Sequence, residues 1–267
     1  MTDTIDVEIA GEAFKVDVSR NVEYFTNNWR AVESGEDEPQ LYAFISEHAD
    51  PDGIFFDVGS FQGSAALLAS RKYAVVFAFE ADPVSAEALR DNIAANEADN
   101  ITVVQKFFGD EKGTQAFYSI DYGNNSGSSA FHTEGKTRWD VETIRIDEFI
   151  LEEGLETAPI YMKIDIEGAE YLSIDALRKT IEKYDVRCVC LSLHPMLLAN
   201  QIKGQSIVAK IRRRILVLSR TLRLLAAFGK FDTLVDAQGK RASRSRLVRD
   251  IITTGRHRVS DSEVYLT

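Results

Sequence analysis

The chain has 267 residues, of which 45% are hydrophobic and 27% are charged, a balance typical of a soluble globular protein with one large domain. Its formal net charge of −11 argues against general nucleic-acid binding. No apolar run approaches the ~20 residues of a membrane-spanning helix. The acidic, alternating N-terminus is unlike a signal or transit peptide, so we expect a cytoplasmic protein.

Residues 4–19 alternate between apolar and polar side chains on both sides of Ala10-Gly11, which predicts a β-hairpin. Residues 20–49 then predict two short helices separated by an acidic turn, and we expect them to form a lid or cap over a sheet. No linker or repeat interrupts the chain from residue 53 onward. We therefore divide it into an N-terminal hairpin and helical appendage (1–49) and one α/β domain (50–267).

The chain is organised around residues 53–82, which predict a strand, a glycine turn, a helix and a second strand. The first strand is a continuous apolar run, as expected of a strand covered on both faces. Asp57, Gly59 and Gly63 then follow in the pattern D-x-G-x-x-x-G. The second strand ends in Glu80, whose carboxylate can accept hydrogen bonds from both hydroxyls of a ribose.

The charge at this turn indicates which nucleotide it would bind. A dinucleotide needs a third glycine and places its pyrophosphate on the helix N-terminus. Here Asp57 would lie beside the ligand, where a carboxylate repels phosphate and attracts an ammonium or a sulfonium. The sequence therefore favours S-adenosylmethionine as the cofactor.

A helix is predicted to begin at Asp82-Pro83 and to end near Asn96, because aspartate suits the N-cap and proline suits the first turn. A third strand follows over residues 101–105. The turn after this strand contains Asp110 and falls at the carboxyl edge of the sheet, where the adenine would rest.

Residues 114–147 break the α/β rhythm. Two predicted strands, TQAFYSI and VETIRI, flank the polar loop 121–135. A loop of this length is commonly functional, so the loop and its His132 are candidates for the acceptor site. Asp147 then opens a short helix as its expected N-cap.

The second dense motif is KIDIEGAE, which continues directly from a predicted strand over residues 161–164. Lys163, Asp165 and Glu167 alternate along it, at the carboxyl edge of the sheet. Lys163 is expected to pair with the neighbouring acids.

A helix over residues 169–183 and a fifth strand over residues 186–193 follow, and the strand ends at His194-Pro195. Cys188 and Cys190 alternate along this strand and would share one face. A reduced pair is the simplest interpretation.

Residues 206–228 predict a long amphipathic helix, and two last strands are expected over residues 231–235 and 263–266. Six apolar residues at spacings of 3 and 4 form a stripe on this helix: Ile207, Ile211, Ile215, Leu218, Leu222 and Leu225. Basic residues surround the stripe, and residues 196–267 carry 15 Lys and Arg against 5 Asp and Glu. Either the helix packs on the sheet with a solvated basic face, or it docks on an anionic membrane, peripherally at the inner membrane face.

Taken together, DVGSFQG, FEADP, KIDIEGAE and a strand closing on LHP resemble the FkbM-type family of S-adenosylmethionine-dependent methyltransferases. The resemblance covers roughly residues 50–195. KIDIEGAE matches the family's K-I-D-x-E-G-x-E closely, and VETIRIDEF is similar to the family's segment ahead of the fourth strand. Phe61 stands where the family usually has asparagine.

The resemblance implies a Rossmann-like, seven-stranded class I methyltransferase sheet and methyl transfer to hydroxyl oxygens of sugars and other natural products. Asp165 and Glu167 would then face the methyl group and the acceptor. The implied cofactor-binding residues are Asp57, Gly59, Ser60 and Gly63 around the methionine end, Glu80 at the ribose and Asp110 near the adenine.

A sugar hydroxyl is a weak nucleophile, so a base that removes its proton accelerates the reaction by roughly 10²–10⁴-fold. The candidates are Asp165, Glu167 and His194. Alternatively, the two carboxylates hold a divalent cation such as Mg²⁺ that acidifies the hydroxyl. No residue is assigned as a metal ligand from the sequence.

We therefore expect an S-adenosylmethionine-dependent O-methyltransferase whose acceptor is a saccharide, a glycoconjugate such as a glycolipid, or a related natural product. Two alternatives stay open. One is an NAD-type oxidoreductase on a similar sheet, and the other is a non-catalytic nucleotide-binding or scaffold protein with the same fold. The oligomeric state is not predicted.

Overall fold

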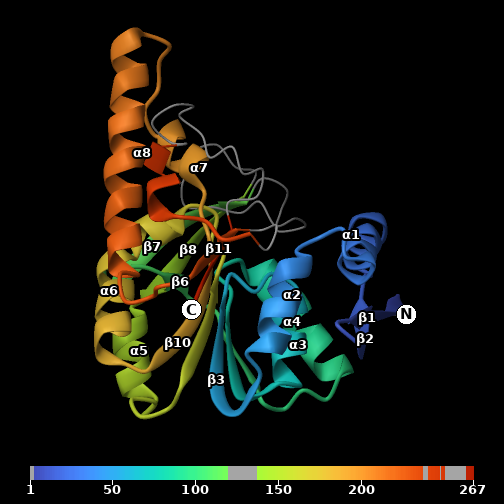
Figure 1. Cartoon of the computed structure of the whole chain (residues 1–267). Coiled ribbons are helices and arrows are strands. Elements are labelled where there is room, and N and C mark those ends of the chain that lie inside the picture. The colour runs from blue at the N-terminus through green and yellow to red at the C-terminus, as the bar shows by residue number, and fades with distance from the viewer. Residues whose placement is uncertain (1–2, 120–136, 237–239, 247, 250–262) are drawn as a thin grey trace.

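The computed structural model describes residues 3–119, 137–236, 240–246, 248–249 and 263–267. The strands of its central sheet are β3 (Asp50–Val58), β4 (Tyr73–Phe79), β5 (Ile101–Val104), β9 (Ile160–Ile164), β10 (Val186–Ser192), β11 (Leu234–Asp236) and β12 (Glu263–Leu266). They lie side by side in the order β11-β12-β10-β9-β3-β4-β5 (Figure 1). From β10 to β5 the strands are parallel, whereas β12 is antiparallel to both of its neighbours. The seven-stranded α/β sheet expected from the sequence is confirmed.

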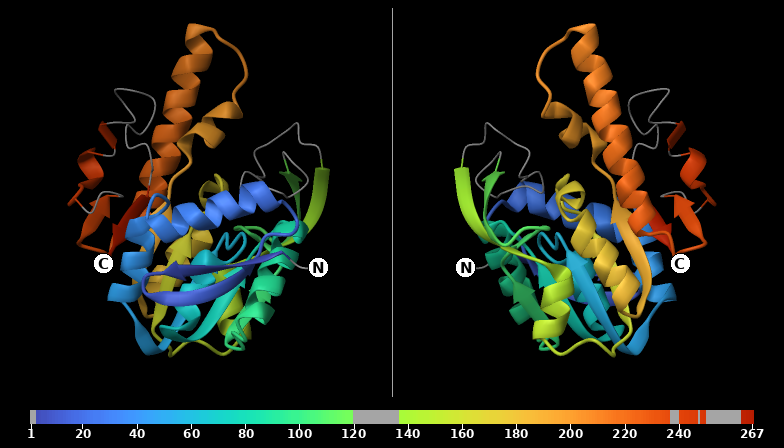
Figure 2. Two further views of the ribbon diagram at one scale, coloured as in Figure 1. Left: turned by 90° about the vertical axis from the view of Figure 1, so that its right-hand side faces the viewer. Right: turned by 90° about the vertical axis from the view of Figure 1, so that its left-hand side faces the viewer.

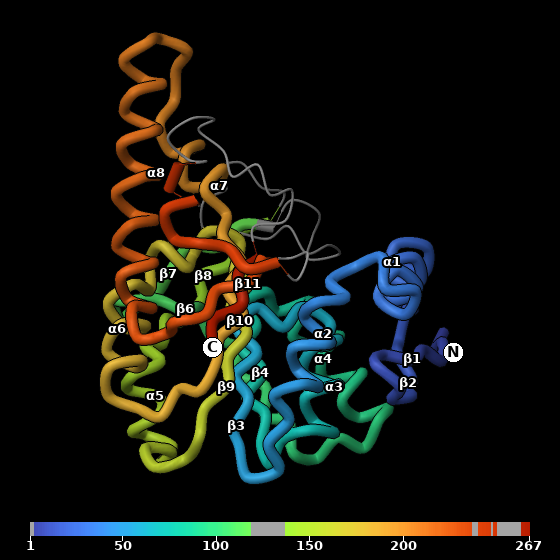
Figure 3. The backbone as a smooth tube through the Cα atoms, viewed as in Figure 1, coloured from blue at the N-terminus to red at the C-terminus, as the bar shows by residue number. Residues whose placement is uncertain are grey.

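Helices cover both faces of the sheet, as the apolar runs of its strands require. One face carries α2 (Pro39–Glu47), α3 (Ser64–Ser70) and α4 (Pro83–Ala95), and the other carries α5 (Ile146–Glu152), α6 (Ile174–Lys183) and α8 (Ile207–Ala227) (Figure 3). The alternation along β3 divides the core between the two layers. Phe55 packs with α3, whereas Phe56 packs with Phe149 of α5.

The N-terminal hairpin consists of β1 (Thr4–Ile9) and β2 (Glu12–Asp17), which pair antiparallel as predicted. Ala10 and Gly11 both have positive φ, the geometry of the two-residue turn that matches strand twist. The expected pair of helices is α1 (Val22–Ser34) and α2. Trp29 of α1 is buried in the same apolar cluster as α3, so this appendage shares a core with the rest of the chain.

A second, three-stranded sheet contains β6 (Phe107–Phe108), β7 (Gly113–Ser119) and β8 (Thr137–Ile144), in the order β6-β8-β7. The pair β7–β8 confirms the two strands predicted around the polar loop. The loop 121–135 itself, with His132, lies outside the described residues.

Two helix starts differ from the sequence-based expectation. Residues 169–183 do not form one helix, because a 3-10 turn, η1 (Ala169–Leu172), ends at Ser173 and α6 begins only at Ile174. Asp147 is not the N-cap of α5. It lies inside the first turn, and its carboxylate accepts a hydrogen bond from Arg145, the residue at the cap position.

After β10 the chain forms α7 (Pro195–Asn200) and then α8, which begins next to α7 and runs back along the sheet. Within the described ranges, no helix is both long and apolar enough to cross a bilayer.

Candidate active site

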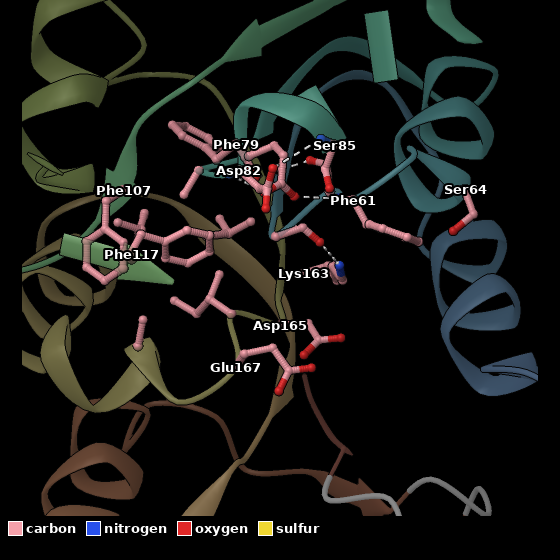
Figure 4. A pocket seen from close by; sticks show the side chains of 18 of the residues that line it. Phe61, Ser64, Phe79, Asp82, Ser85, Phe107, Phe117, Lys163, Asp165 and Glu167 are labelled. Atoms are coloured by element: carbon pink, nitrogen blue, oxygen red, sulfur yellow. Dashed lines mark hydrogen bonds between the residues drawn. The ribbon is translucent and has the colours of Figure 1, made fainter. Parts of the chain in front are cut away.

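A pocket lies at the carboxyl edge of β3, β4 and β9 (Figure 4). Its walls come from the turn between β3 and α3, the ends of β4 and β9, the start of α4, strands β6 and β7, and the helical N-terminal region. Asn28, Val32, Asp37 and Glu38 close it on the side of α1 and α2. The appendage that the sequence predicted as a cap therefore supplies part of the wall.

The turn between β3 and α3 is held against the ends of β4 and β9 by backbone contacts. Gly59 and Ser60 both donate amide hydrogen bonds to the carbonyl of Phe79. Gly59 has a φ of +84°, and a Cβ built on it would lie 1.8 Å from the carbonyl oxygen of Asp165. Glycine is therefore required here for close approach of two backbones. Gly63 likewise packs against Leu89 and is not among the residues lining the pocket.

Asp57 lies beneath the pocket, and its side chain is fully buried. Its carboxylate is 3.3 Å from the ammonium of Lys163, which also donates a hydrogen bond to the carbonyl of Gly59. Burial lowers the pKa of Lys163, but Asp57 and Asp165 outweigh burial and hold it above its ordinary value. The sequence predicts that Asp57 lies beside the ligand. In the structure, Lys163 matches the charge of Asp57, and the Asp57 side chain lies beneath the glycine turn and supports it.

Glu80 is in the pocket wall, at the end of β4. One carboxylate oxygen accepts a hydrogen bond from the amide of Phe61 at 2.7 Å, and the other accepts one from the amide of Asp82 at 2.8 Å. Burial raises the pKa of Glu80 to about 7 despite these two hydrogen bonds. Each oxygen keeps a lone pair for a further donor, so the group fits a ribose diol.

Phe61 has a φ of +49°, a left-handed conformation in which asparagine is common and a bulky side chain is unusual. The backbone geometry thus explains an asparagine at this position in the family pattern. Three of the five described non-glycine residues with positive φ, Glu38, Phe61 and Glu167, line the pocket. Strained backbone of this kind is concentrated at functional sites.

Asp110 is not brought to the pocket. Its carboxylate accepts hydrogen bonds from the amides of Asp175 and Ala176 at the start of α6. The wall on that side is apolar and contains Phe107, Phe108 and Phe117. The sequence-based reasoning missed this aromatic wall, although the FF pair just before Gly109 was a signal for it.

Asp165 and Glu167 line the opposite side of the pocket, and His194 lies against them. The Nε2 atom of His194 is 3.4 Å from Asp165 Oδ1 and 3.8 Å from Glu167 Oε2. The three candidates, from the ends of two neighbouring strands, thus converge. Burial raises the pKa of Glu167 to about 7.

Glu170, which the sequence-based reasoning did not single out, holds His194 from behind. It is fully buried, accepts the backbone N–H of His194 at 2.7 Å and lies 3.4 Å from Nδ1 of the ring. Burial lowers the pKa of His194, but Glu170, Asp165 and Glu167 together raise it to about 10. The ring is therefore an imidazolium at neutral pH, fixed between three carboxyl groups.

Asp165, Glu167 and His194 each offer one ligand atom, and these atoms lie within 4.8 Å of one another. The donor types suit a divalent cation. A metal would have to displace the proton on His194, which the three carboxyl groups stabilise. The cluster therefore fits a cation only when His194 is deprotonated.

Comparison with known proteins adds the family context. Residues 57–212 match the family model described as the methyltransferase FkbM domain. The hexuronic acid methyltransferase AglP of Haloferax volcanii is 28% identical over 167 residues, which are 62% of this chain and 66% of that protein. The uncharacterized protein MJ1452 of Methanocaldococcus jannaschii is 33% identical over 61 residues, 23% of this chain and 24% of that protein. The matches thus span less than two thirds of either relative.

Solved methyltransferases also align with the chain. A SAM-dependent methyltransferase from Agrobacterium tumefaciens aligns with 100% of this chain and 70% of its own, at 11% identity and a TM-score of 0.44. SMU.1697c of Streptococcus mutans, in complex with SAH, aligns with 84% of this chain and 93% of its own, at 10% identity and a TM-score of 0.42.

Proposed function

The chain belongs to the FkbM methyltransferase family, and on this premise we propose that it transfers a methyl group from S-adenosylmethionine to a hydroxyl group of a saccharide or glycoconjugate. The observation that carries the proposal is that carboxylates lie on two opposite sides of one pocket. Glu80 is fixed by two amides on one side, and Asp165 and Glu167 meet His194 on the other.

The cofactor would lie along the turn of Gly59 and Ser60. Glu80 would accept hydrogen bonds from the ribose hydroxyls, and the aromatic wall with Phe107 and Phe117 would contact the flat adenine. When bound, S-adenosylmethionine supplies an electrophilic methyl group on a sulfonium. The protein then has to hold the acceptor oxygen in line, about 3 Å from that carbon.

Charge supports this choice of cofactor over a dinucleotide. The pocket lining contains six carboxyl groups, those of Asp37, Glu38, Glu80, Asp82, Asp165 and Glu167, and two lysines, Lys106 and Lys163. Such a surface attracts a sulfonium and an ammonium and repels a pyrophosphate. The NAD-type alternative is therefore the weaker one.

We assign proton removal from the acceptor hydroxyl to Glu167. A general base works best when its pKa lies near the operating pH, and burial raises the pKa of Glu167 to about 7. His194 is already protonated, so it cannot accept the proton itself. It holds the two carboxylates in place, and Asp165 is left to accept a hydrogen bond from the acceptor.

The acceptor class is supported by the resemblance of the chain to a hexuronic acid methyltransferase. Sugars, nucleotide sugars and glycolipids are the acceptors to test with a radiolabelled methyl donor, with and without magnesium. We expect transfer to a sugar hydroxyl and tight binding of S-adenosylhomocysteine by calorimetry. Tight binding of NAD without any affinity for S-adenosylhomocysteine would overturn the proposal.

A further inference from the structure

Helix α8 exposes a row of large apolar side chains on its outer face. The exposed fractions are 76% for Ile207, 58% for Val208, 52% for Ile211, 61% for Ile215 and 46% for Leu222. At 100° per residue these five positions fall within an arc of about 100° around the helix, over a length of about 22 Å. They form a single stripe, which we call the outer stripe.

A different face of α8 packs on the protein. Ala209, Val217 and Leu224 are buried and lie on the side away from the outer stripe, and Thr221 and Leu225 are also buried in the C-terminal part of the helix. Four of the six residues in the stripe predicted from the sequence are in the outer stripe, and of the six only Leu225 is buried. Helix α8 does pack on the protein, but its exposed side is apolar as well as basic, so it has one apolar face inside and another outside.

Basic side chains border the outer stripe on both sides. Arg214 lies on one edge, and Arg212 and Arg223 lie on the other. Residues 207–227 contain no Asp or Glu. Arg212 and Arg214 are exposed and form no ion pair with any residue in the described ranges. Arg213 differs, because it donates hydrogen bonds to the carbonyls of Ile202 and Gly204 and so anchors the start of the helix.

The outer stripe lies at the pocket end of the molecule. α8 begins beside α7, which follows the carboxyl end of β10, and its N-terminal half projects past the sheet (Figures 1 and 2). The pocket opens at the same carboxyl edge.

We propose that the outer stripe and its arginines dock the protein on an anionic phospholipid surface, with α8 lying in the plane of the interface. An apolar stripe bordered by arginines suits acyl chains and anionic headgroups together. A second copy of the chain would bring two arginine-bordered rows together, with no acid on either helix to match them. A nucleic acid would leave the five apolar side chains in water. The inference goes beyond the proposed function, since it concerns the helix alone.

The test is sedimentation of the full chain with sucrose-loaded vesicles of phosphatidylcholine and phosphatidylglycerol (70:30), and with phosphatidylcholine alone, in 0.15 M salt. We expect binding to the anionic vesicles. Arg212→Gln with Arg214→Gln should weaken it roughly 30-fold, since one cationic side chain near such a surface contributes about fivefold. Ile211→Gln with Ile215→Gln should weaken it at least about tenfold.

Matched controls lie on other faces of the molecule. Arg90→Gln with Lys179→Gln removes two exposed charges, and Leu151→Gln removes a side chain that is 54% exposed. Both should bind vesicles within about twofold of the parent. All variants should keep the parent's unfolding midpoint, because surface substitutions change stability little.

Several outcomes overturn the proposal. The parent chain fails to sediment with anionic vesicles, or the controls weaken binding as much as the α8 variants. Alternatively, Ile211→Gln with Ile215→Gln leaves vesicle binding unchanged. If this double variant instead converts a dimer to a monomer in light scattering, the outer stripe is an interface between two copies of the chain. Stronger binding to an RNA homopolymer than to vesicles would assign it to nucleic acid. Vesicle binding is measured without any acceptor, so failure here leaves the methyltransferase proposal standing.

Discussion

The two sides of the pocket are built in different ways. On the side proposed for the cofactor, the amides of Phe61 and Asp82 fix Glu80, and the glycine turn rests on the backbone just after β9. On the side proposed for the acceptor, a buried Glu170 fixes His194, and the charges of Asp165 and Glu167 complete the cluster. Backbone hydrogen bonds survive most side-chain changes, whereas a charge cluster depends on each member. We therefore expect cofactor affinity to depend chiefly on Glu80, and turnover to depend on each member of the cluster.

The largest expected effect separates the two sides. Glu167→Gln should lower turnover about 10²- to 10⁴-fold, the usual contribution of a general base, while affinity for S-adenosylhomocysteine stays within about twofold. Steady-state kinetics and calorimetry measure the two quantities. Glu97→Gln is the matched control, because Glu97 has the same left-handed backbone (φ of 50° against 48°) and is exposed away from the pocket. An equal loss of cofactor affinity in Glu167→Gln would mean that the two sides are not independent.

The next effect concerns Lys163, which joins the two sides. Lys163→Met should lower the free energy of unfolding by about 3–5 kcal/mol, because it leaves Asp57 buried without a matching charge. Urea unfolding measures this, and the double variant Asp57→Asn with Lys163→Met should recover most of the loss. Lys112→Met removes an ion pair from a side chain that is 64% exposed and should change the free energy of unfolding far less. A similar cost for both lysines would contradict the buried pairing.

A smaller effect tests the cofactor side. Glu80→Gln should weaken binding of S-adenosylhomocysteine about 10- to 100-fold, since hydrogen bonds to a charged group contribute about 1.5–3 kcal/mol. Turnover at saturating cofactor should change little. The control is Glu87→Gln, an exposed acid on the adjacent helix α4. If Glu80→Gln binds as tightly as the parent, the ribose does not lie at this carboxylate.

The smallest effect is a pH dependence. Burial raises the pKa of Glu80 to about 7, so lowering the pH from 8 to 6 protonates the group and removes an acceptor for the ribose hydroxyls. Affinity for S-adenosylhomocysteine should therefore fall about tenfold over that range, as expected for binding to the ionised form alone. This loss of affinity at low pH should persist in Glu167→Gln and disappear in Glu80→Gln. Persistence in Glu80→Gln would assign the titration to another group.

The contrast between local and long-range contacts also explains what the sequence could predict. The strands, the hairpin and the glycine turn follow from periodicity and from residues close together in the chain. Asp82 caps α4 as predicted, because its partners are the next two amides, Val84 and Ser85.

What the sequence could not predict depends on distant partners. Asp110 was placed near the adenine, but its carboxylate binds amides at the start of α6, more than sixty residues later. Glu170 was overlooked because its partner, His194, lies on the far side of α6 and β10 in the chain. Periodicity predicted α8 as a helix, yet it cannot tell which of two apolar faces the rest of the protein covers.

The contact between Gly59 and the carbonyl of Asp165 has an evolutionary consequence. Because a side chain at Gly59 would clash with this carbonyl, the turn proposed to lie under the cofactor and the strand end that carries Asp165 pack directly against each other. We expect related enzymes to change their choice of acceptor through the outer walls, which include Asn28 of α1 and Glu38 at the N-cap of α2, without altering this spacing. Diversification of substrates should be found in those walls, and the inner seam should stay constant.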